Sequence, residues 1–105
     1  MAFKESELPF VVFGEKTAYF NKDEIYLEAL EKFGAEKQLN KLNEECGELI
    51  QATSRKLNGQ ENNLAEELAD VMIMIEQTIL FHDLGDEVYK IKNEKLLRLK
   101  KRLEG

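Results

Sequence analysis

The stretch LNEECGELI at residues 42–50 decides the fold, because its pattern returns as LAEELADVM at residues 64–72. Each copy places an apolar residue before two carboxylates, followed by an apolar residue, a small residue, a third carboxylate and two more apolar residues. Around both copies apolar residues recur every three or four positions, which is the spacing of an amphipathic helix. The repeat therefore predicts two similar helices in succession.

A turn separates these two predicted helices. Asn58 and Gly59 should end the first, since glycine readily adopts the left-handed backbone that closes a helix. Asn63, followed three residues later by Glu66, matches a capping box and should start the second. A connection of a few residues makes neighbouring helices antiparallel, so the sequence predicts a helical hairpin.

Two further helices are predicted outside this hairpin. Asn21 with Glu24 matches another capping box, Gly34 interrupts the periodicity, and residues 84–86 break it again. The expected helices span about residues 22–33, 35–57, 64–82 and 88–103.

The same spacing predicts one apolar stripe on each hairpin helix. The stripe of the first helix is Leu39, Leu42, Cys46, Leu49, Thr53 and Leu57. The stripe of the second is Leu64, Leu68, Val71, Ile75, Thr78 and His82. Cys46 should therefore act as a small buried hydrophobic residue. His82 should be a core or interface residue rather than a metal ligand.

Length and composition favour one all-α domain. The chain has 105 residues with one proline and six glycines, so few residues interrupt helices. We expect a helical bundle of about four helices per chain over residues 21–105, built around the antiparallel central hairpin. Long helices in so short a chain bury little apolar surface, so oligomerisation into a homodimer or a dimer of dimers should complete the bundle. Residues 1–20 should form an N-terminal extended arm or one short strand.

The charge excludes several classes of partner. The chain carries 21 Asp and Glu against 15 Lys and Arg, a net charge of −6, so it lacks the cationic surface that binds nucleic acid or an anionic membrane. No apolar run reaches the ~20 residues of a membrane-spanning helix. The single cysteine cannot form an internal disulfide, so a cytoplasmic location is expected. Residues 85–105 depart from this balance with a net charge of +3, which leaves −9 on residues 1–84.

Four carboxylates of the repeat should meet on the hairpin. Glu45 and Glu48 lie on adjacent turns of one helical face, as do Glu67 and Asp70, since each residue turns the helix by about 100°. Reflection about the turn puts the two pairs at similar heights. Carboxylates so close repel one another unless a cation intervenes, and Mg²⁺ or Mn²⁺ prefers such oxygen ligands. One pair alone would indicate a solvated face, but two matching pairs favour a metal site that engages phosphates.

These residues resemble a known family. EECGE at residues 44–48, followed by ELAD at residues 67–70, is similar to the EExxE and ExxD motifs of the MazG-like, all-α NTP pyrophosphohydrolases. That superfamily includes dimeric dUTPases, dCTP pyrophosphatases and phosphoribosyl-ATP pyrophosphohydrolase. The resemblance covers about residues 28–103, and KLLR at residues 95–98 looks like the Lys-x-x-Arg stretch of phage and bacterial members. Residues 1–20 have no counterpart in it.

The resemblance implies a Mg²⁺-dependent hydrolase that converts a nucleoside triphosphate to the monophosphate and pyrophosphate. The motif positions assign the metal ligands to Glu45, Glu48, Glu67 and Asp70. Glu44 would orient the attacking water or lie in the outer shell around the metal ligands. Lys95 and Arg98 are candidates to bind the substrate phosphates through charge-assisted hydrogen bonds. The alternative for these two cations is a solvated face or salt bridges across a subunit contact.

Two other functions use the same residues differently. A helical assembly or regulatory module could keep the carboxylates without efficient turnover, and a complete basic set opposite the carboxylates would distinguish the enzyme from it. A di-iron carboxylate bundle requires Glu-x-x-His pairs, whereas both copies here end in a carboxylate. The sequence therefore favours the pyrophosphohydrolase.

Overall fold

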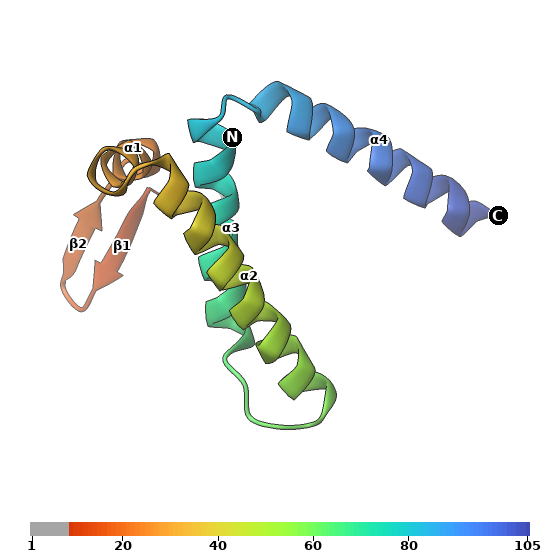
Figure 1. The fold of residues 1–105 in the computed structure, drawn as a ribbon. Coiled ribbons are helices and arrows are strands. Elements are labelled where there is room, and N and C mark those ends of the chain that lie inside the picture. The colour runs from red at the N-terminus through yellow and green to blue at the C-terminus, as the bar shows by residue number, and fades with distance from the viewer. Residues whose placement is uncertain (1–8) are drawn as a thin grey trace.

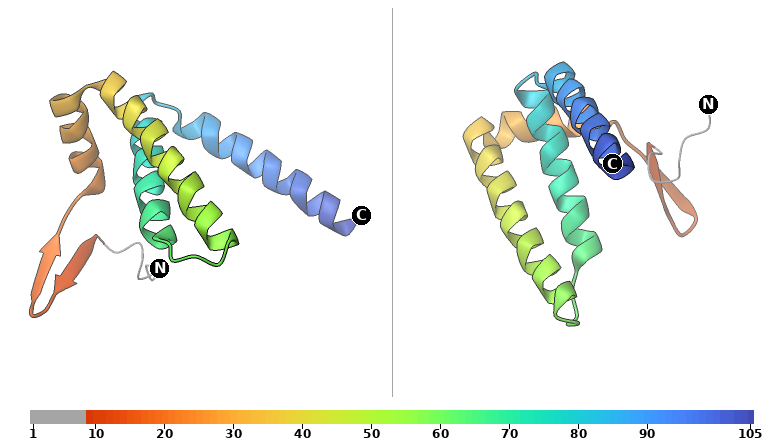
Figure 2. Two further views of the ribbon diagram at one scale, coloured as in Figure 1. Left: turned by 60° about the horizontal axis from the view of Figure 1, so that its bottom comes forward. Right: turned by 90° about the vertical axis from the view of Figure 1, so that its right-hand side faces the viewer.

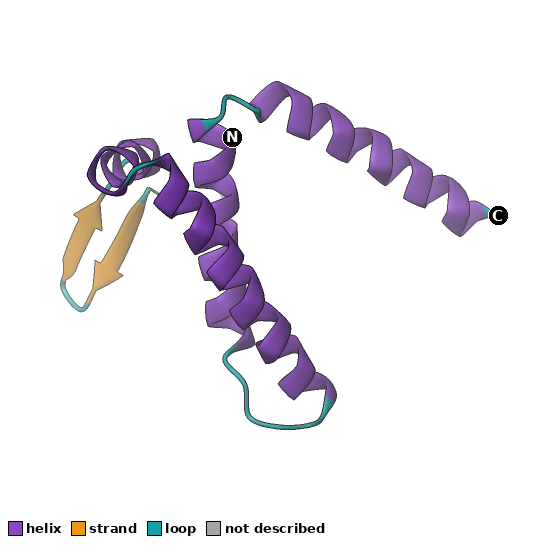
Figure 3. Ribbon diagram, in the orientation of Figure 1, coloured by secondary structure: helices purple, strands orange, loops and turns teal. Residues whose placement is uncertain are grey.

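Helices dominate the structure, a computed structural model that describes residues 9–105 (Figures 1 and 3). Two strands precede the helices in chain order: β1 Phe10–Phe13, β2 Lys16–Tyr19, α1 Lys22–Phe33, α2 Ala35–Leu57, α3 Leu64–Phe81 and α4 Gly85–Glu104. The helices begin and end close to the predicted positions. The predicted all-α class is confirmed.

α1 begins as its capping box predicts. The side-chain oxygen of Asn21 accepts a hydrogen bond from the Glu24 backbone N–H at 3.2 Å, which pairs one of the free donors at the helix start. Gly34 ends α1 with a φ of 86°, and its N–H donates to the Leu30 carbonyl at 2.8 Å. Because α2 begins at the next residue, Gly34 forms the corner between the two helices.

α2 and α3 form the antiparallel hairpin that the repeat predicts (Figure 2). Gly59 turns the chain with a φ of 67°. The capping box predicted at the start of α3 is wrong, because Asn63 makes no side-chain cap and Asn62 instead accepts a hydrogen bond from the Leu64 N–H at 3.1 Å. The side-chain nitrogen of Asn63 instead donates a hydrogen bond to the carboxylate of Glu67 in α3.

The buried faces of the hairpin coincide with the predicted stripes only in part, since Val71 is buried as predicted. The buried residues of α2 are Gln38, Glu45 and Ala52. Those of α3 are Glu67, Val71, Met74 and Gln77. Leu57, predicted in the first stripe, is 87% exposed, and Leu68 and Ile75, predicted in the second, are each 45% exposed. Both helices are turned so that glutamates face the opposite helix, and this rotation leaves large apolar side chains outside.

Two residues predicted inside the fold lie farther out. Cys46 is half-buried. His82 is exposed just after α3, where its backbone N–H donates to the Thr78 carbonyl at 3.1 Å. It is therefore not a core residue of the single chain, and its place at an interface stays a prediction.

α1 is tied to α3 near the open end of the hairpin. Tyr26 is buried, and its hydroxyl donates to Glu76 Oε2 at 2.7 Å. Lys22 Nζ donates to the same oxygen at 3.2 Å. Burial, reinforced by the Glu76 carboxylate, raises the pKa of Tyr26 well above its usual value, because an ionised phenol there would be poorly solvated and next to a negative charge.

The N-terminal arm forms a hairpin rather than one strand. β1 and β2 pair antiparallel, with Phe10 opposite Tyr19 and their ring centroids 5.6 Å apart. Gly14 turns the chain between them with a φ of 61°. Within the described chain, the strands contact each other and no helix. Residues 1–8 of the predicted arm lie outside the described residues.

α4 leads away from the hairpin. After a bend at Asp83, which has a φ of 51°, the helix leaves the end of α3 and extends away from α2 (Figures 1 and 2). Among the elements of residues 9–105 it contacts α3 alone, and none of its residues is buried there. Its apolar side chains are therefore open to solvent in the single chain.

Candidate metal centre

Three acidic side chains from two helices converge on the hairpin. One carboxylate oxygen each from Glu45 on α2 and from Glu67 and Asp70 on α3 lie within 4.8 Å of one another. Antiparallel packing brings them together, because the turn reflects one copy of the repeat onto the other. The structure thus unites three of the four predicted metal ligands.

Glu45 and Glu67 are the most buried members of this cluster, each only 6% exposed. Lys41 Nζ contacts Glu45 Oε1 at 3.0 Å, and Asn63 Nδ2 donates to Glu67 Oε1 at 2.7 Å. The second oxygen of each glutamate has no hydrogen-bond partner among the described residues. A buried carboxylate oxygen without a partner costs free energy, so this donor set fits a cation.

Glu48, the fourth predicted ligand, adjoins the cluster without being one of the three convergent residues. The pKa of Glu48 is raised above its usual value, mainly by the nearby Glu45 carboxylate and further by Glu67. Neighbouring negative charges disfavour ionisation of the Glu48 carboxyl. Glu48 therefore lies within electrostatic reach of both buried glutamates.

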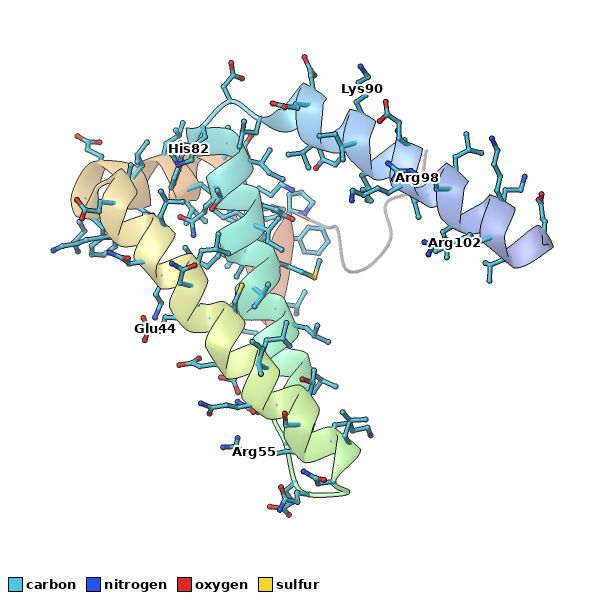
Figure 4. The ribbon with its side chains drawn as sticks, turned by 45° about the vertical axis from the view of Figure 1, so that its right-hand side comes forward. Glu44, Arg55, His82, Lys90, Arg98 and Arg102 are labelled. Carbon is cyan, nitrogen blue, oxygen red and sulfur yellow. The ribbon has the colours of Figure 1, made fainter. Side chains whose placement is uncertain are left out.

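Glu44, the predicted catalytic residue, faces solvent. Its side chain is 59% exposed, and its Oε2 lies 3.6 Å from Lys41 Nζ. Figure 4 shows Glu44 projecting from the same side of α2 as Arg55. Glu44 thus borders the acidic cluster from the solvent side rather than contributing to the convergent oxygens.

Lys41 is a residue of this site that sequence reasoning missed. Its ammonium group contacts both Glu44 and Glu45. The hydrogen bond with Glu45, followed by the Glu44 charge, raises the pKa of Lys41. The signal was present, since a lysine three and four residues before two glutamates is spaced for helical ion pairs. Lys41 offsets part of the negative charge of the cluster.

Lys95 and Arg98, the predicted phosphate-binding cations, are not brought to the carboxylates in the single chain. Both lie on α4, which extends away from α2 (Figure 1). Lys95 and Arg102 lie on one exposed face of α4, beside the apolar side chains of Leu96 and Leu99. The candidate cations and the candidate metal ligands therefore lie on separate parts of one chain.

Comparison with known proteins identifies a family over the hairpin and most of α4. The family model described as MazG nucleotide pyrophosphohydrolase domain matches residues 33–101, which contain α2, α3 and most of α4. No match was found among curated proteins or solved structures. None of the helices described is both long and apolar enough to cross a membrane. Because the match covers more than half of the chain and includes the convergent carboxylates, the protein belongs to the MazG nucleotide pyrophosphohydrolase domain family.

Proposed function

We propose that the protein is a nucleoside triphosphate pyrophosphohydrolase, which uses Mg²⁺ or Mn²⁺ to convert a ribo- or deoxyribonucleoside triphosphate and water to the monophosphate and pyrophosphate. One observation carries this proposal: next to Asp70, Glu45 and Glu67 each keep a buried oxygen that has no partner among residues 9–105. Such an arrangement is stable only when a cation or a proton offsets the charge. The family supplies the class of reaction.

The metal ligands in this proposal are Glu45, Glu48, Glu67 and Asp70. All of them supply oxygen, the ligand type that Mg²⁺ and Mn²⁺ prefer. A bound divalent cation would neutralise charge on the phosphates and lower the pKa of a coordinated water. Lys41 and Asn63 hold one oxygen of Glu45 and of Glu67, respectively, and so orient the free oxygen of each ligand.

Other side chains act on the water and the phosphates. Glu44, exposed beside the cluster, accepts a hydrogen bond from the attacking water and orients it toward the α-phosphorus. Lys95 and Arg98 donate hydrogen bonds to the phosphate oxygens and offset their charge. Because α4 leads away from the carboxylates, these two residues need a second chain or a different position of α4 to act there.

Self-association belongs to the proposal because the hairpin exposes much apolar surface. Leu68, Met72 and Ile75 lie on one side of α3 and are 45%, 60% and 45% exposed, and Ile50 and Leu57 of α2 are 66% and 87% exposed. Soluble monomers rarely expose continuous apolar surface of this extent. A homodimer or a dimer of dimers would cover it. The net charge of −6 argues against nucleic acid as a partner.

The proposal is tested by incubating the protein with each common nucleoside and deoxynucleoside triphosphate, with Mg²⁺ and separately with excess chelator. Monophosphate and pyrophosphate should appear in equal amounts and only with the metal. Release of orthophosphate would contradict the reaction. Metal binding without turnover of any nucleotide would instead support the regulatory module that keeps the carboxylates.

A further inference from the structure

The ion pair between Lys41 and Glu45 is not of the kind that stabilises a helix best. The Lys41 ammonium group lies 3.0 Å from Glu45 Oε1 and 3.6 Å from Glu44 Oε2. A lysine placed four residues before a glutamate is the less favourable order, because both charges then oppose the helix dipole. The stability of α2 alone therefore does not account for this contact.

Lys41 instead supplies positive charge to the acidic cluster. Apart from Lys41, no lysine or arginine of residues 9–105 forms an ion pair with the carboxylates gathered here, which are those of Glu44, Glu45, Glu48, Glu67 and Asp70. Lys41 also lies within electrostatic reach of Glu48. In the single chain Lys41 therefore acts as the counter-ion of Glu45, at a place where a metal ion would act in the same way.

Lys41 is free to leave Glu45 without disturbing the packing of the hairpin. Its side chain is 48% exposed, whereas the side chain of Glu45 is 8% exposed. Glu44, the other partner of Lys41, projects into solvent from α2 (Figure 4). A lysine side chain carries a compact charge on a flexible stem and binds phosphate as well as carboxylate. Lys41 can thus turn to the solvent side of the cluster, from which a nucleotide would approach.

We propose that Lys41 couples the binding of the metal to the binding of the nucleotide. Without nucleotide, Lys41 occupies Glu45 Oε1, and its charge opposes the approach of a second cation. With nucleotide, Lys41 leaves Glu45 and donates hydrogen bonds to phosphate oxygens, so that both oxygens of Glu45 are available to the metal. This inference rests on the proposed function and adds to it a substrate-binding residue from the same helix as Glu45 and Glu48.

Calorimetric titration with Mn²⁺ alone tests the competition between Lys41 and the metal. Lys41→Gln should bind Mn²⁺ about tenfold more tightly than the wild type, because the metal no longer meets a positive charge at Glu45. Lys41→Arg keeps that charge and should bind Mn²⁺ as the wild type does. Lys37→Gln, an exposed change one turn earlier on α2, removes a charge outside the cluster and is the matched control.

Titration with a preformed complex of Mn²⁺ and inorganic tripolyphosphate tests the contact with phosphate. Lys41→Gln should bind this complex about fivefold more weakly than the wild type, because it cannot form the charge-assisted hydrogen bonds to phosphate. The probe contains no base or ribose, so the result does not depend on which nucleotide is the substrate. A lysine that only orients Glu45 would weaken both titrations, whereas the coupling predicts opposite changes.

Two results would overturn the inference while the proposed function stands. One is Mn²⁺ binding to Lys41→Gln that is equal to or weaker than binding to the wild type. The other is binding of the tripolyphosphate complex to Lys41→Gln that is equal to or tighter than binding to the wild type. A wild type that binds no Mn²⁺ in either titration would contradict the proposed metal site itself, and the inference with it.

Discussion

Glu45 on α2 and Glu67 on α3 face each other across the hairpin, each 6% exposed and each with one side-chain oxygen that lacks a hydrogen-bond partner within residues 9–105. Asp70 brings a third carboxylate within 4.8 Å. Charges of one sign at this distance and depth repel strongly, because little water screens them. Without a cation, the repulsion among these carboxylates therefore destabilises the folded state at this position.

Glu67→Gln should have opposite effects with and without metal. Loss of one negative charge removes repulsion with Glu45, while the amide can still accept from Asn63. Without metal the melting temperature should rise, by ~4–8 °C for about 1 kcal/mol in a domain of this size. The rise that Mg²⁺ produces in the wild type should be lost, since a ligand stabilises only the state that binds it.

Thermal melts with Mg²⁺ and with chelator measure both effects of Glu67→Gln. Glu61→Gln, in the exposed turn between α2 and α3, is the matched control and should leave both melting temperatures unchanged. A variant that is destabilised without metal would show that the glutamates do not repel each other in the folded state.

Glu48→Gln should abolish metal-dependent activity while the protein stays folded. Its carboxyl lies beside Glu45 and Glu67 and offers a further oxygen to a cation. We expect at least a tenfold weaker Mn²⁺ affinity by calorimetry, which corresponds to about 1.4 kcal/mol, with an unchanged circular dichroism spectrum. Glu36→Gln, an exposed change on the same helix, is the control. Full activity in Glu48→Gln would remove this residue from the site.

Tyr26→Phe should loosen α1 from α3. The hydroxyl donates to Glu76 at 2.7 Å, and loss of one such hydrogen bond costs about 1 kcal/mol in the free energy of unfolding. Because the folded-state pKa of Tyr26 is raised above its ordinary value of 10.0, its contribution is complete below pH 10 and is lost as the pH rises above it.

Urea titrations at pH 8 and pH 11 should therefore show a larger difference between wild type and Tyr26→Phe at the lower pH. Tyr89→Phe, on exposed α4, serves as the comparison. An equal difference at both pH values would mean that the hydroxyl is not held in a site that disfavours its ionisation.

Gly34→Ala should destabilise the corner between α1 and α2. The φ of 86° is strained for a residue with a side chain, at a cost of about 1–3 kcal/mol. The space around the residue is open, so the cost comes from the backbone alone. Gly47→Ala, inside α2 and equally open, should instead be neutral or stabilising. Urea denaturation of both variants measures the contrast, and equal stabilities would contradict it.

Local sequence patterns predicted the elements of the fold well. Gly34, Gly59 and the Asn21 cap mark helix boundaries that depend on backbone conformation over a few residues, and these boundaries are confirmed. The meeting of Glu45 with Glu67 and Asp70 was also predicted, because the short turn makes the two helices antiparallel and so sets these carboxylates at the same height. Local rules suffice where neighbours in sequence decide the structure.

The rotation of the hairpin helices could not be predicted in the same way. Apolar spacing grouped Leu68 and Ile75 with Val71 in one stripe, but only Val71 is buried in the single chain, and Glu67 takes the inner face. The spacing of apolar residues identifies the apolar face of a helix but not the element that packs on it. In this chain α2 and α3 carry more large apolar residues than the single chain buries. The path of α4 depends on such non-local packing as well.

The most direct test of the central claim is hydrolysis in oxygen-18 water with Mg²⁺, followed by mass spectrometry of both products. Water directed to the α-phosphorus should place one heavy oxygen in the nucleoside monophosphate and none in pyrophosphate. Heavy oxygen in pyrophosphate or in orthophosphate, or the absence of any metal-dependent turnover, would contradict the account.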